Sequence, residues 1–169
     1  ATSGMKWNHK EKHMTYFDTP GKDNTDAVMA IVKRRAGELG ITTAVVASYR
    51  GYTAEKAVLA LDGMKIVIIA GFAHPTMENL AETFAMGDEN LIRSKSTVLV
   101  ATHLLSGMGR AMRKKFGASS SEEIVGQALR MVGVGVKVGV ECAVMAADAG
   151  LVGTDEEIEF VEAAKETHF

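Results

Sequence analysis

The strongest constraint on the fold comes from two runs of consecutive apolar or β-branched residues. Ile41–Ser48 and Lys65–Ala70 carry such side chains at neighbouring positions rather than at every second one. A strand with this pattern is covered on both faces, which is typical of a parallel sheet between layers of helices. Helical patterns alternate with these runs along the chain. The sequence therefore predicts an α/β fold with three layers, α/β/α, around a mostly parallel, doubly wound sheet.

The other elements are predicted from periodicity and turn residues. Short apolar runs indicate further strands at 14–17, 97–102 and 158–161. Helices are expected at 25–39, 53–61, 77–86, 107–116, 121–132 and 134–149. The alternation Val134–Val140 has the period of a strand, but the Ala- and Met-rich residues that follow favour a helix there. Segment 87–96 is polar, and its pattern predicts neither a helix nor a strand.

The length of 169 residues fits a single domain. We expect that domain to span 14–169, with the polar residues 1–13 as a disordered extension or a tag remnant. A formal net charge of −2 without a long basic run argues against a nucleic-acid binder. The basic cluster Arg110, Arg113, Lys114 and Lys115 is expected on the exposed end of a helix that stops at Gly117.

The apolar stretch 131–150 is interrupted by Lys137, Glu141 and Asp148, so it predicts a core segment and not a membrane span. A single cysteine, Cys142, excludes an internal disulfide and is expected to be a buried thiol. Both features favour a cytoplasmic protein. No metal site is expected, because the histidines at helical spacing fall in the N-terminal extension and the methionines are typical of core packing.

The candidate functional residues follow the strands. Ligands of an open parallel sheet bind beyond the carboxyl ends of its strands, and the loops expected there are rich in polar residues and glycine. Neither the nucleotide-triphosphatase phosphate loop nor the dinucleotide Gly-x-Gly-x-x-Gly is present. The residues expected to line one crevice are Asn24, Thr25, Ser48, Arg50, Gly51, Thr53, His103, Ser106 and Gly107.

The turn Ser48–Thr53 has two interpretations. The start of a helix exposes backbone N–H groups and a partial positive charge, so a turn of this composition suits a phosphate. Alternatively, Ser48 or Thr53 caps the helix and Gly51 makes the turn. Three other polar loops at the same predicted edge shift the balance toward an anion site.

His103 also has two interpretations, as a ligand contact or proton-transfer group and as a structural hydrogen-bonding residue. Ser106 lacks the surroundings of a nucleophilic serine, and a helix cap is the favoured role. Glu141 falls on an otherwise apolar helix, where a buried carboxylate needs a partner such as an arginine or a backbone N–H.

The stretch Tyr16–Gly150 resembles archaeal and bacterial stand-alone proteins that are similar to the C-terminal α/β domain of pyruvate kinase. The matching segments are 16–25, 45–48 with 51–54, 103–107, and 138–141 with 145–150. The resemblance implies that Ser48, Gly51 and Thr53 contact a phosphate, with Asn24, Thr25, His103 and Ser106 nearby, and that flavin mononucleotide (FMN) is a candidate ligand. Arg50 matches in chemistry and not in the family's pattern.

The resemblance weakens at the end of the chain. Relatives follow the last strand with a glycine-rich segment and a further strand, whereas here Glu159–Glu162 passes directly to Ala163–Phe169. We therefore expect the C-terminal part of the domain to be incomplete or to lack the loop that closes over the ligand.

The sequence thus predicts a domain that binds a phosphorylated small molecule, with no established catalytic activity. The first alternative is an enzyme acting on a phosphorylated or carboxylated metabolite, with His103 as acid or base. The second alternative is a structural or assembly module, since apolar α/β domains often form homo-oligomers.

Overall fold

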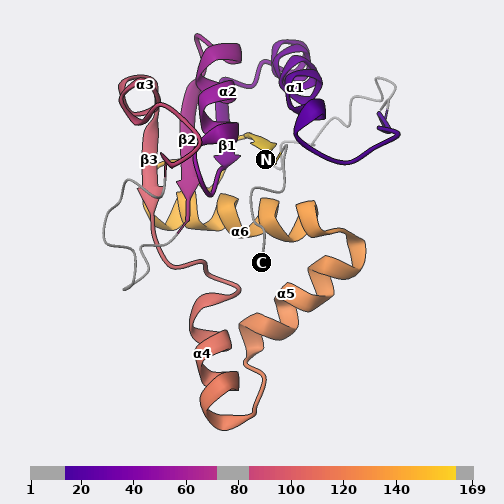
Figure 1. Cartoon of the computed structure of the whole chain (residues 1–169), viewed down its shortest axis with the longest axis vertical. Coiled ribbons are helices and arrows are strands. Elements are labelled where there is room, and N and C mark those ends of the chain that lie inside the picture. The colour runs from indigo at the N-terminus through magenta and orange to yellow at the C-terminus, as the bar shows by residue number, and fades with distance from the viewer. Residues whose placement is uncertain (1–13, 72–83, 163–169) are drawn as a thin grey trace, which may run out of the picture.

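The computed structural model describes residues 14–71 and 84–162 (Figure 1). The expected extension 1–13, most of the predicted helix 77–86 and the end of the chain from 163 lie outside the described residues. What is described is an α/β fold in which helices flank a parallel sheet. The expected fold class is therefore confirmed.

The described elements follow the predicted alternation closely. They are η1 (Lys22–Asn24), α1 (Thr25–Leu39), β1 (Thr43–Ala47), α2 (Tyr52–Ala60), β2 (Lys65–Ala70), α3 (Glu89–Lys95), β3 (Thr97–Val100), α4 (Gly107–Phe116), α5 (Ser121–Val132), α6 (Val134–Asp148) and β4 (Glu159–Val161). The prediction that 134–140 enters a helix is confirmed. Helix α3 lies in the polar segment that the sequence left open, and Asp88 caps it by accepting a hydrogen bond from the Leu91 N–H.

The predicted strand at 14–17 is wrong. These residues form no strand, and Met14 and Tyr16 are 74% and 83% exposed. A strand needs a neighbour with open hydrogen-bonding groups, and both edges of β1 are already paired, one with β2 and the other with β4. The short apolar run therefore has no place beside β1 in the sheet.

All four described strands are parallel, in the order β3-β2-β1-β4. Val46 lies opposite Ile68 on one side and Val161 on the other. The chain winds from β1 through β2 to β3 in one direction, and β4 is added on the opposite side of β1. This reversal makes the sheet doubly wound and sets its switch point between β1 and β4.

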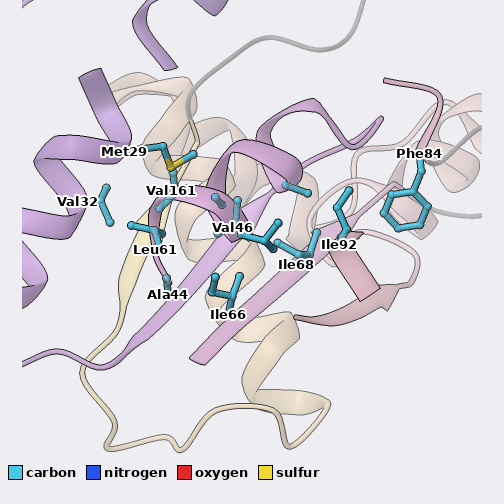
Figure 2. Close-up of a cluster of buried hydrophobic side chains, with 13 residues drawn as sticks. Met29, Val32, Ala44, Val46, Leu61, Ile66, Ile68, Phe84, Ile92 and Val161 are labelled. Carbon is cyan, nitrogen blue, oxygen red and sulfur yellow. The ribbon is translucent and has the colours of Figure 1, made fainter. Parts of the chain in front are cut away.

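Alternate side chains of the strands feed two separate cores. On one face, Ala44, Val46 and Ile68 pack with residues of α1, α2 and α3, as Figure 2 shows. On the other face, Val45 and Val67 pack with the buried side of α6. Every one of these strand residues is at most 1% exposed, which explains why the sequence shows unbroken apolar runs.

None of the helices in the described part of the chain is long and apolar enough to cross a membrane.

Candidate functional site

The turn after β1, Gly71 at the end of β2 and the loop after β3 meet at the carboxyl edge of the sheet. The Ser48 N–H donates to the Ile69 carbonyl at 3.0 Å, and a Cβ added to Gly71 would lie 2.6 Å from the Tyr49 ring. On the other side of the same strand end, His103 Nε2 lies 3.3 Å from the Ala70 carbonyl oxygen. The end of β2 therefore links the turn after β1 to the loop after β3, as the sequence predicts for an open parallel sheet.

Ser48 organises the turn that opens α2. Its side chain is buried, and its Oγ accepts a hydrogen bond from the Ala54 N–H at 3.1 Å. Gly51 occupies the N-cap position with φ of +95°, a left-handed conformation that favours glycine. The structural interpretation of these two residues, a side-chain cap and a glycine turn, is thus confirmed.

The turn is also fixed from outside. The Met86 N–H donates to the Arg50 carbonyl at 2.8 Å, and a Cβ on Gly51 would lie 3.2 Å from the Phe84 Cα. In return, a Cβ on Gly87 would lie 2.5 Å from the Gly51 carbonyl oxygen. Two glycines thus allow the segment at 84–87 to pack backbone against backbone on the turn.

The cap is compatible with an anion at the same turn. The first N–H groups of a helix have no partner within the helix, and in α2 the Ser48 hydroxyl accepts from that of Ala54. The N–H groups of Tyr52 and Thr53 precede it on the same turn. Thr53 is buried and Arg50 is exposed at the tip. An anion held here would be shielded on one side and open to solvent on the other.

The start of α1 lies beside this turn. Asp26 in the first turn of α1 pairs with Lys56 in the second turn of α2 at 2.9 Å. Asn24 takes the N-cap position of α1, but its side-chain amide donates to the Thr19 carbonyl at 2.6 Å instead of capping the helix. Thr25 is fully buried, and its hydroxyl oxygen has no hydrogen-bond partner.

Lys22 is a candidate residue that the sequence did not single out. Its ammonium nitrogen lies 4.8 Å from the centre of the Tyr52 ring and 3.7 Å from the Met86 sulfur. A cation is thereby held at the first residue of α2, next to the glycine turn. The one available signal was its position in the polar stretch before α1, since its reach to α2 depends on tertiary packing.

His103 lies on the α6 side of the edge, beside a buried ion pair. Its Nδ1 is 3.8 Å from a Glu141 carboxylate oxygen, and Glu141 pairs with Lys137 one helical turn earlier. Glu141 also accepts a hydrogen bond from the Leu105 N–H at 2.7 Å. The expectation that the Glu141 carboxylate is paired is confirmed, with Lys137 and a backbone N–H as the partners.

Ser106 and Gly107 begin α4. Ser106 occupies the N-cap position, as expected, but its side chain makes no capping hydrogen bond. Both residues donate their backbone N–H groups to the His103 carbonyl, at 3.3 and 2.9 Å. A Cβ on Gly107 would lie 2.0 Å from the Thr102 methyl carbon, so a larger residue here would have to displace the Thr102 side chain.

The predicted site residues therefore form two groups. Asn24, Thr25 and the 48–53 turn lie where α1 and α2 begin, whereas His103, Ser106 and Gly107 lie between β3 and α4. The strand end at 69–71 separates the two groups and contacts both.

Cys142 and the acidic residues add no second candidate centre. Burial raises the pKa of the Cys142 thiol to about 12, so the thiol is neutral and unreactive at ordinary pH. Within residues 14–71 and 84–162, no group of three or more histidine, cysteine, aspartate and glutamate side chains is placed to hold a metal ion.

The sequence matches no protein-family model.

Proposed function

We propose that this chain binds a phosphorylated small molecule at the carboxyl edge of its sheet, with the phosphate on the turn Ser48–Thr53. The observation that carries the proposal is the rigid glycine turn at the start of α2, with the Lys22 ammonium held beside it. FMN is the candidate ligand, by the resemblance to the pyruvate kinase C-terminal family.

The chemistry of the turn suits a dianion. Backbone N–H groups at a helix start donate toward the ligand, and the helix dipole adds a partial positive charge. Lys22, held over the Tyr52 ring, and Arg50, within the turn itself, supply full positive charges. Ser48, Gly51 and the segment at 84–87 already fix the backbone of the turn.

The remaining residues fit supporting roles. In this proposal the phosphate contacts Ser48, Gly51 and Thr53, as in the family that the chain resembles. The rest of the ligand extends along the edge between Asn24 and Thr25 on one side and a second group on the other. That second group comprises His103, Ser106 and Gly107.

The test compares FMN with riboflavin, which has the same ring system and no phosphate. FMN and inorganic phosphate are expected to raise the melting temperature, and riboflavin is expected to leave it unchanged. The variants Lys22→Met and Arg50→Gln should each weaken FMN binding about tenfold, because each removes a charged contact to the phosphate.

Lys95→Met is the matched control. Lys95 ends α3 and pairs with Asp62 at 3.3 Å, away from the candidate turn. Its variant should bind FMN as the unmodified chain does. If neither FMN nor phosphate stabilises the protein, or if Lys95→Met weakens binding as much as Lys22→Met, the proposed site is wrong.

The enzymatic alternative gains no support from the position of His103. Both of its ring nitrogens face protein oxygen atoms, those of Ala70 and Glu141. This arrangement favours a role in fixing the loop after β3 over proton transfer to a ligand.

A further inference from the structure

A large apolar surface covers Leu104, the arm, defined as α4, α5 and the linking residues 117–120, and the outer side of α6. Figure 1 shows the arm extending away from the sheet. Of the ten residues of α4, only Gly109 is buried. Among the described residues, twelve large hydrophobic side chains on this surface are more than a third exposed. They are Leu104, Met108, Met112, Phe116, Ile124, Val125, Met131, Val132, Val134, Val136, Val140 and Val144.

These side chains form stripes at helical spacing. Met108, Met112 and Phe116 follow one another every four residues along α4. A second stripe, also spaced by four, runs along α6 and comprises Val136, Val140 and Val144. Side chains at this spacing share one face of a helix. Each stripe is therefore a continuous apolar surface and not a scatter of single exposed residues.

Helix α6 is apolar on two opposite sides. Cys142, Met145 and Ala146 pack on the sheet, whereas Val140 and Val144 face outward. A helix that is hydrophobic all round is normally covered all round. We therefore expect the outer side of α6 to be covered by another surface, because none of the described residues covers it.

The size of the surface matches a protein interface. Twelve such side chains together expose on the order of 1,000 Å², and a standard stable interface buries about 800 Å² per partner.

We propose that this surface is a dimer interface whose occupant is a second copy of the same chain, with the α4 stripe of one copy on the α6 stripe of the other. The two stripes have the same spacing, and a two-fold axis would form the contact twice. This proposal does not depend on the phosphate site.

Charge complementarity supports this occupant. The α4 stripe ends beside Lys115, in the last turn of the helix, where Arg113 pairs with Glu123 of α5 at 3.4 Å. The α6 stripe ends at Asp148, and the loop that follows carries exposed acidic residues at 155–157. When the two helices pack in the same direction, the basic end of one lies beside the acidic end of the other. Such pairing fixes orientation and disfavours other partners.

Sedimentation velocity over a range of concentrations tests the proposal. The unmodified chain should sediment as a dimer at micromolar concentration, and Met112→Glu or Val140→Glu should each raise the dissociation constant at least tenfold. Leu59→Glu is the matched control, because Leu59 is 56% exposed on α2, outside the surface. That variant should dimerise normally.

A charge exchange tests the orientation of the two copies. Lys115→Glu should weaken the dimer about tenfold, and adding Asp148→Lys should recover part of the loss. Circular dichroism checks that each variant keeps its helices, so a lost dimer is not mistaken for unfolding.

Several outcomes would overturn the proposal. One is a monomer at every concentration with the stripes open to solvent in hydrogen exchange. Another is a monomer with protected stripes, which would mean that a further segment of the same chain covers the surface. A third is a dimer that is insensitive to Met112→Glu and Val140→Glu. None of these results would bear on FMN binding, which Lys22→Met tests separately.

Discussion

The sheet body, defined as the four strands with α1, α2 and α3, and the arm both contain apolar helix faces, but they differ in what covers those faces. In the body, Met29 of α1, Val58 of α2 and Ile92 of α3 are at most 1% exposed against the sheet. In the arm, Met108 and Met131 are 74% and 89% exposed. Amphipathic periodicity thus marks a face that needs covering, and it does not say whether the cover belongs to the same chain.

The largest expected loss of stability comes from a substitution in the Lys137–Glu141 ion pair, where the arm joins the body. Lys137→Met leaves the buried Glu141 carboxylate without its cationic partner, next to the Leu105 N–H at the root of α4. Removing one partner of a buried ion pair costs about 3–5 kcal/mol. Urea denaturation should show a loss of this size in the free energy of unfolding.

The double variant Lys137→Met with Glu141→Gln is the control for that prediction. A neutral amide still accepts the Leu105 hydrogen bond and leaves no buried charge. It should recover at least half of the lost stability. A single variant that stays within about 1 kcal/mol of the unmodified chain would mean that the pair contributes little to joining the arm to the body.

The tight packing of the body is tested by two glycines with similar backbone conformations. Gly51 and Gly63 have φ of +95° and +90°, but only Gly51 has close neighbours, with Phe84 Cα at 3.2 Å from an added Cβ. Gly63→Ala should cost about 1 kcal/mol from backbone strain alone, and Gly51→Ala about 2–3 kcal/mol because crowding adds to it. Thermal denaturation compares the two variants. Equal losses of stability would show that residues 84–87 move to accommodate the added Cβ with no loss of free energy.

The same substitution can be made in both regions. Ile68 is completely buried in β2, and Ile124 is 62% exposed on α5. Ile68→Val should lower the free energy of unfolding by about 1 kcal/mol. Ile124→Val should change it by less than about 0.5 kcal/mol at concentrations too low for association. If Ile124→Val becomes as costly as Ile68→Val when the protein is concentrated, the arm is covered only in an assembly.

The elements of the sheet body were predictable from sequence because their signals are local. β1 and β2 were identified from runs that are buried on both faces, and Gly40 ends α1 in the left-handed conformation that a helix stop requires. The strand predicted at 14–17 failed because apolar side chains alone do not provide a pairing partner, and β1 is already paired on both sides. Pairing depends on β4, more than a hundred residues further along the chain.

The candidate site was only partly predictable for the same reason. Its loops could be assigned to one edge because parallel strands end together. The Lys137–Glu141 pair was visible as a spacing of four residues on one helix. The contact of Lys22 with Tyr52 had no such signal, because η1 and α2 meet only in the folded chain. Likewise, no local pattern reveals that the segment at 84–87 fixes the turn at Gly51.

The smallest expected changes in stability come from substituting two carboxylates whose pKa values shift in opposite directions. Glu162 follows β4 at the start of α6, where burial raises its pKa above 4.5, partly offset by Lys137. Glu156 lies on the body, where hydrogen bonds from Thr43 and the Gly153 N–H lower its pKa below 4.5. A raised pKa means that the folded state binds the proton more tightly than the unfolded state.

These shifts predict opposite pH profiles. The contribution of Glu162 is fully present below its unfolded pKa and is lost as the pH rises through the folded value, so Glu162→Gln should gain stability at neutral pH relative to the unmodified chain. The contribution of Glu156 is present above its unfolded pKa and is lost as the pH falls through the folded value, so Glu156→Gln should lose stability at neutral pH and little in acid. Melting temperatures measured from pH 3 to pH 8 compare the two. Profiles that move in the same direction would show that burial at the start of α6 does not set the charge of Glu162, and the junction between body and arm would then be open to water.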